Sequence, residues 1–124
     1  MCLLRTEPKK IAEEDVVCYK FLERSRYFGI FGTKLKSPYR GVKYTLGKMK
    51  KSKLITEKIF LFHAPIVNIG LHSFVDYDDV VEFIESSDYV VVKCIIPKGA
   101  EYILGLFDGF PSYASDKLLP VEII

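Results

Sequence analysis

The chain has 124 residues, of which 49% are hydrophobic and 27% charged, and its formal net charge is +2. This length suits one domain, and the many apolar and aromatic residues argue against a disordered chain. No apolar run approaches the roughly 18 residues that a membrane helix needs, and the charged residues soon after Met1 argue against a secretory signal. We therefore expect one cytoplasmic domain over residues 1–124 and no membrane partner, with residues 1–14 as an extended arm or a short turn of helix.

The charge is distributed unevenly along the chain. Residues 1–62 hold 15 Lys and Arg against 6 Asp and Glu, whereas residues 63–124 hold 3 against 10. The two halves can pack against each other and partly neutralise, or the basic half can present a face to an anionic partner. The three cysteines are not spaced as a zinc site or a disulfide framework, and we expect Cys18 and Cys94 to be buried free thiols.

The first half of the chain has the pattern of short strands. Alternating apolar residues over residues 15–23 predict a half-buried strand. Residues 24–36 predict a hairpin or a loop, and residues 37–41 predict a turn because they contain proline and glycine. Residues 42–47 predict a short strand, and the lysine-rich residues 48–53 predict a loop.

The second half continues with strands around one helix. Residues 55–62 and 69–74 predict strands, and residues 89–97 predict a central strand because they are rich in β-branched side chains. Residues 102–107 are compatible with a strand or a loop, and residues 108–112 predict a turn-rich loop. The last strand is expected at residues 118–124, where Pro120 indicates an edge or a bulge.

Residues 76–86 predict the principal helix. Asp76 suits its N-cap, and Asp78 and Asp79 suit its first turn, where carboxylates complement the helix dipole. These carboxylates can also bind a cation, but capping is the simpler interpretation. The fold class we expect is α+β: a mostly antiparallel sheet of about five to seven short strands with one principal helix.

Few residues indicate chemistry. His63 and His72 are the two histidines, and their spacing does not match a helical metal pair, so we expect no metal site. A structural role is favoured for His63. His72 and Ser73 precede the predicted helix, at a junction where side chains often face a cleft. A structural role and a functional role are equally compatible with the position of His72.

A basic segment could contact phosphates of a nucleic acid. Its candidate residues are Arg40, Lys43, Lys48, Lys50, Lys51 and Lys53. The segment is short and has Tyr39 and Tyr44 as its nearby aromatic residues, so a solvated loop is the simpler interpretation.

Several motifs resemble a set of small proteins of gut bacteria and their phages. The motifs are SPYRGVKYTLGK, GLHSF followed by a short helix, VVVKCIIPKGAEY and YASDKL, and the opening residues 2–20 match as well. The resemblance spans most of the chain and is weakest over residues 24–36. Those proteins have no assigned function, so the resemblance implies a bacterial or phage context and no activity.

The order of motifs also resembles the ADP-ribosyltransferase fold. That resemblance implies an NAD-binding enzyme with His72, Ser73, Arg40 and a late acidic residue, Asp116 or Glu122, at its site. The chain departs from the family pattern, because YRG lies in a turn, the middle motif is HSF, and no clear glutamate motif occurs near Asp116. Fold analogy alone gives little support for a reaction.

We favour a non-enzymatic function from these patterns. The expected protein is a small binding or interaction module, with phage–host conflict as one setting and an unidentified protein or small ligand as its partner. It would need no cofactor. The two alternatives are an ADP-ribosyltransferase-like enzyme that uses NAD, and a nucleic-acid binder that uses residues 40–53.

Overall fold

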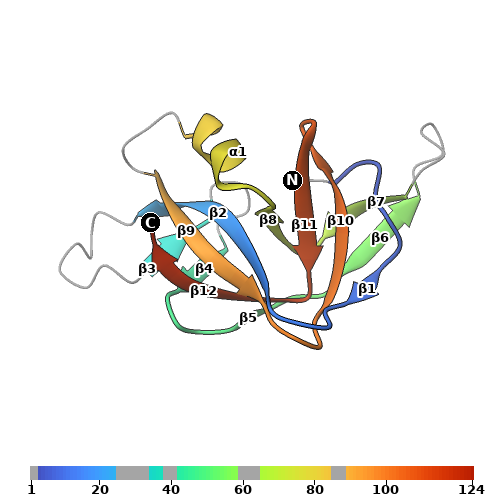
Figure 1. Cartoon of the computed structure of the whole chain (residues 1–124), viewed down its shortest axis with the longest axis horizontal. Coiled ribbons are helices and arrows are strands. Elements are labelled where there is room, and N and C mark those ends of the chain that lie inside the picture. The colour runs from blue at the N-terminus through green and yellow to red at the C-terminus, as the bar shows by residue number, and fades with distance from the viewer. Residues whose placement is uncertain (1–2, 25–33, 38–41, 59–64, 85–88) are drawn as a thin grey trace.

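The computed structural model describes residues 3–24, 34–37, 42–58, 65–84 and 89–124. Within these ranges nearly all regular structure is antiparallel strand, with one short helix (Figure 1). The expected α+β class therefore fits loosely, because the fold is nearly all β.

The described residues form twelve strands, more than the about five to seven that the sequence led us to expect. In chain order they are β1 (Lys10–Ile11), β2 (Val16–Arg24), β3 (Lys34–Lys36), β4 (Lys43–Thr45), β5 (Lys50–Lys51), β6 (Ile55–Lys58), β7 (Pro65–Ile69), β8 (Leu71–Phe74), β9 (Tyr89–Ile96), β10 (Glu101–Phe107), β11 (Phe110–Ser115) and β12 (Lys117–Ile123). Ten of them form one sheet, with the order β1-β10-β11-β8-β2-β9-β12-β5 and the β3–β4 hairpin attached to β2. Strands β6 and β7 form a separate hairpin, at the right of Figure 1.

Strand β9 is central, as residues 89–97 predict. It lies between β2 and β12 and pairs with β2 along its whole length. Five of its eight residues are Val or Ile, which pack well on a buried pleated surface. Its pairing with β12 shifts register between Pro120 and Glu122, which confirms the bulge that Pro120 predicts.

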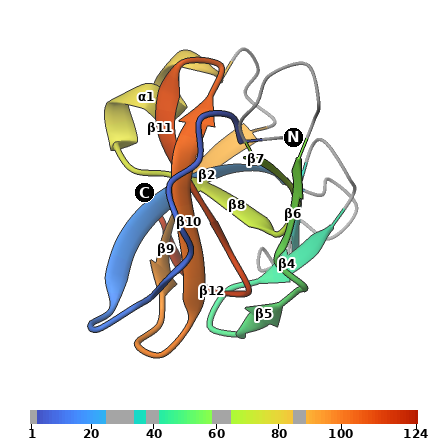
Figure 2. The ribbon, with the colours of Figure 1, turned by 90° about the vertical axis from the view of Figure 1, so that its right-hand side faces the viewer.

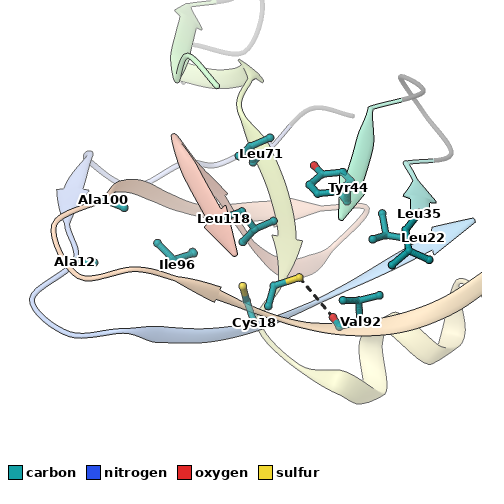
Figure 3. Close-up of a cluster of buried hydrophobic side chains, with 11 residues drawn as sticks. Ala12, Cys18, Leu22, Leu35, Tyr44, Leu71, Val92, Ile96, Ala100 and Leu118 are labelled. Atoms are coloured by element: carbon teal, nitrogen blue, oxygen red, sulfur yellow. Dashed lines mark hydrogen bonds between the residues drawn. The ribbon is translucent and has the colours of Figure 1, made fainter. Parts of the chain in front are cut away.

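The main core covers one face of β2 and β9. Its buried residues, drawn in Figure 3, are Ala12, Cys18, Leu22, Leu35, Tyr44, Leu71, Val92, Cys94, Ile96, Ala100 and Leu118. Cys18 and Cys94 are partners in the β2–β9 ladder, and both are buried free thiols, as expected. The Cys94 thiol donates to the Val92 carbonyl at 3.7 Å, the dashed line in Figure 3.

Helix α1 (Tyr77–Glu82) covers the other face of β2, at the top of Figure 1. It has six residues and is shorter than the expected helix 76–86; residues 85–88 lie outside the described residues. Val80 is fully buried against Phe21, and the Phe21 ring stacks on Phe83 with centroids 6.2 Å apart. Within the described ranges no helix is long and apolar enough to cross a bilayer.

Asp76 occupies the N-cap position of α1, but its side chain does not cap the helix. Its backbone is extended, with φ −112° and ψ 138°, as at an N-cap, yet its carboxylate makes no capping hydrogen bond. The expected position is therefore confirmed and the expected bond is wrong. The carboxylates of Asp78 and Asp79 lie in the first turn, where they complement the helix dipole.

Two segments expected as loops contain strands. Residues 108–112 hold only a two-residue turn, Asp108 and Gly109, both with positive φ, and the chain continues from Phe110 into β11. Such a turn matches the twist of an antiparallel pair and closes the β10–β11 hairpin. The lysine-rich residues 48–53 include strand β5, which pairs with β12.

The N-terminal residues 3–11 run along the sheets and are docked on them. Leu3 is fully buried and exchanges backbone hydrogen bonds with Val67 of β7. Leu4 does the same with Leu106 of β10. The arm passes so close to β10 that a Cβ at Gly105 would lie 3.0 Å from the Leu4 carbonyl oxygen, which explains why this position is a glycine.

Truncating side chains on the two faces of β9 should lower the free energy of unfolding by different amounts. Ile96 is fully buried on one face, whereas Ile95 on the opposite face is only half-buried. Ile96→Ala should lower the free energy of unfolding by about 2–5 kcal/mol, because it leaves a cavity in the main core. Ile95→Ala should cost clearly less. Urea denaturation of the two variants measures both effects, and equal midpoints would contradict the assignment of the faces.

Replacing Asp76 tests the absence of a capping bond. A capping aspartate typically contributes about 0.5–2 kcal/mol, but the Asp76 carboxylate accepts no hydrogen bond from the first turn. We expect Asp76→Ala and Asp76→Asn to have nearly the same denaturation midpoint as the wild type. A loss for Ala that Asn restores would show that the side chain caps the helix in solution.

Candidate functional site

A cavity of about 290 Å³ adjoins the main core, where β4, β5 and β8 approach β2. Figure 2 shows β4, β5 and β8 on one side of the molecule. Ligand sites typically measure about 300–1,000 Å³, so this volume suits a small metabolite. Because Lys51 lines the cavity and is exposed, the cavity opens to solvent at β5. The described lining residues are Lys20, Ser37, Val42, Tyr44, Lys50, Lys51, Ser52, Ile69, Gly70, Leu71 and His72.

Lys20 reaches this cavity because β2 and β8 pair only at Tyr19 and Phe74 before they separate. Lys20 is 7% exposed and stands on the buried face of β2. Its Nζ donates to the His72 carbonyl at 2.6 Å and so joins the two strands beside the end of their backbone pairing. It also lies 5.4 Å from the centroid of the Tyr44 ring, within the range of a cation–π contact.

The environment of Lys20 disfavours its charged form. Burial lowers the pKa of Lys20 to about 8, because a desolvated ammonium is less stable than a neutral amine. An ammonium has three donors, and the described residues supply one acceptor, the carbonyl of His72. No lining residue among those described is acidic. A bound anion would supply the missing acceptors and charge.

The rest of the lining is also suited to an anion. Lys50 and Lys51 of β5 add two ammonium groups, and Ser37 adds a hydroxyl donor. Ser52 also lines the cavity, but its hydroxyl donates to the Lys53 carbonyl at 3.0 Å. Burial raises the pKa of Tyr44, so its phenol stays protonated and can donate a hydrogen bond.

β5 and the residue after it are held in place by β12 and the turn before it. Lys50 and Lys51 pair with Leu118 and Lys117, and the Ser52 N–H donates to the Asp116 carbonyl at 2.8 Å. These contacts fix the cavity wall that carries the two lysines.

Both predicted residues of the HSF motif are buried on β8. Burial, with a smaller effect from the charge of Lys20, lowers the pKa of His72 to about 4, so His72 is neutral at pH 7. Its Nε2 and the Ser73 hydroxyl have no hydrogen-bond partner among the described residues. Burial raises the pKa of the Cys18 thiol to about 11, and an interaction with the Ser73 side chain opposes part of this rise. His63 lies outside the described residues.

The structure does not bring the late acidic candidates to the cavity. Asp116 lies between β11 and β12, where its carboxylate accepts the Glu101 backbone N–H at 3.0 Å, a structural role. Glu122 is exposed on β12 and does not line the cavity. Arg40 lies outside the described residues. Across the described ranges no group of three His, Cys, Asp or Glu could hold a metal ion.

The lysines expected to contact nucleic acid fall into two groups. Lys50 and Lys51 line the cavity, together with Tyr44. Tyr44 is only 3% exposed, so its ring cannot stack on a base at the surface. The remaining described lysines of this segment are exposed and lie outside the cavity: Lys43, Lys48 and Lys53.

Lys20 was not among the site residues predicted from the sequence. The signal was present, because the alternation of β2 places Lys20 on the same face as Cys18 and Leu22, which are fully buried. A lysine on an apolar strand face is unusual, since lysine is rarely buried without a partner. Tyr44, Ser37 and Ser52 carry no comparable signal, because only the folded sheet brings them together.

No known protein family, curated protein or solved structure matches the chain. The function must therefore be inferred from the cavity and its residues.

The buried His72 predicts a pH-dependent stability. Its folded pKa of about 4 lies below its ordinary 6.5, so the unfolded chain binds more protons between these values. The free energy of unfolding should fall by about 3 kcal/mol from this residue as the pH drops through that window. His72→Gln should remove this part of the slope. Denaturation at a series of pH values tests the difference, and parallel curves for the two proteins would contradict it.

Proposed function

We propose that the protein is a binding module for a small anionic ligand, held in the cavity of Lys20. The observation that supports this most directly is the lining itself: three lysines and no acidic residue among the described positions. A buried ammonium without a carboxylate partner is costly, and the commonest reason to retain one is a function. This proposal agrees with the small-ligand form of the binding module that the sequence led us to expect.

The electrostatics of the cavity favour an anion over a neutral ligand. Hydrogen bonds between an ammonium and an anionic oxygen are stronger than neutral ones, and the low local dielectric strengthens them further. Lys20 would supply the deep contact, while Lys50 and Lys51 would hold the ligand near the mouth. The Ser37 hydroxyl and the Tyr44 phenol would orient it.

The alternative functions have less support from the cavity. A nicotinamide dinucleotide is a large ligand, and an ADP-ribosyltransferase needs a carboxylate near the reacting carbon, which the described lining does not supply. A nucleic-acid site needs exposed aromatic rings or a broad basic face, and Tyr44 is buried.

Calorimetric titration with oxalate and with inorganic phosphate tests the proposal. We expect either anion to bind the wild-type protein and to raise its melting temperature by mass action. Lys20→Met should reduce the affinity at least tenfold, because it removes charge-assisted hydrogen bonds. The same variant should have a stability close to that of the wild type, because it relieves the desolvation of a buried charge but leaves the His72 carbonyl without its donor.

The matched control is Lys98→Met, which removes an exposed lysine at the turn after β9. It should bind both anions as tightly as the wild type. Equal affinity for Lys20→Met and Lys98→Met, or no binding of either anion to the wild type, would overturn the proposal.

A further inference from the structure

We infer that the anionic ligand also carries an aldehyde or keto group, and that Lys20 bonds to this group as an imine. This inference rests on the proposed anion site and names the ligand class more closely: a small oxo acid or a phosphorylated aldehyde. It assigns Lys20 the role of a nucleophile and Lys50 and Lys51 the role of holding the anionic end.

The position of Lys20 carries the inference. Its amine is at the wall of a cavity, on a strand of the main sheet, and is 7% exposed. The hydrogen bond to the His72 carbonyl at 2.6 Å and the contact with the Tyr44 ring fix its direction. No carboxylate lies among the described lining residues to hold it as an ion pair, so the nitrogen is available to a ligand that enters from β5.

Lysines at two different depths of the cavity match a ligand with two functional groups. Lys20 is buried, whereas Lys51 is exposed at the mouth and Lys50 is half-buried beside it. A carboxylate or phosphate near β5 would point the other end of a short molecule at Lys20. Holding the two reactants in this way raises their effective concentration.

The bond formation balances without an added oxidant or reductant. The nitrogen lone pair of neutral Lys20 attacks the carbonyl carbon, and the oxygen takes a proton, which gives a carbinolamine. The amine proton is then lost and water leaves with the former carbonyl oxygen, so amine and carbonyl become imine and water. Burial lowers the pKa of Lys20 to about 8, which makes much of it neutral near that pH. Tyr44 lines the same cavity, and its protonated phenol would supply a hydrogen-bond donor there.

Reductive trapping tests the inference. The folded protein is incubated at pH 8 with glyoxylate and cyanoborohydride, which converts an imine into a stable carboxymethyl amine. Peptide mass spectrometry then compares Lys20 with the exposed Lys98. We expect Lys20 to be modified at least tenfold faster, because its amine is more often neutral and glyoxylate is held beside it. With acetaldehyde, which lacks the carboxylate, the preference for Lys20 should be smaller, because only the larger neutral fraction of its amine then favours it.

Two variants keep the test decisive. Lys20→Arg keeps the positive charge but cannot form an imine, so it should still bind oxalate and lose the fast modification. Lys98→Arg should retain both. If the wild type binds oxalate but modifies Lys20 no faster than Lys98, the imine is wrong and the anion site stands. If the wild type binds no oxalate and shows no preference for Lys20, both proposals fail.

Discussion

Strands β2 and β8 stay together for only one residue pair, Tyr19 and Phe74, and this early separation determines where the site forms. A longer ladder would close the space that the cavity occupies. Lys20 enters the opening, and its hydrogen bond to the His72 carbonyl satisfies a backbone acceptor beside the separated strands. The same residue therefore joins two strands of the sheet and presents an amine to the cavity.

A buried ammonium can persist here because the sheet is supported on both faces. On one face of β2 and β9 lies the main core, which includes the fully buried Leu22, Val92 and Ile96. On the other face, Val80 and a group of aromatic rings cover β2. The apolar burial around Lys20 stabilises the fold enough to offset the desolvation of one charge. Strand residues that face a core are normally apolar, and Lys20 departs from this pattern. Such departures occur most often at functional sites.

The sequence predicts the strands whose own residues specify them. Strands β2, β9 and β12 follow from alternation, β-branched residues and the position of Pro120, because these signals are local. Strand β11 was missed because Pro111 and Gly109 resemble a loop, although the Asp108–Gly109 pair is also the signature of a tight hairpin. The cavity could not be predicted, since its central hydrogen bond joins residues 52 positions apart and depends on where two strands separate.

The uneven charge of the chain has two consequences in the structure. Strands of the basic and the acidic half lie in one sheet and adjoin at several places, as β2 and β9 do. Lys9 of the basic half also pairs with Glu101 of the acidic half at 3.3 Å, so part of the charge is neutralised. The lysines of β5 have no ion pair among the described residues. Their positive charge is therefore concentrated beside the mouth of the cavity, where it would attract anions and raise their local concentration. In the proposed function, the lysines at the mouth would first attract the anion over a distance, and the amine of Lys20 would then contact it.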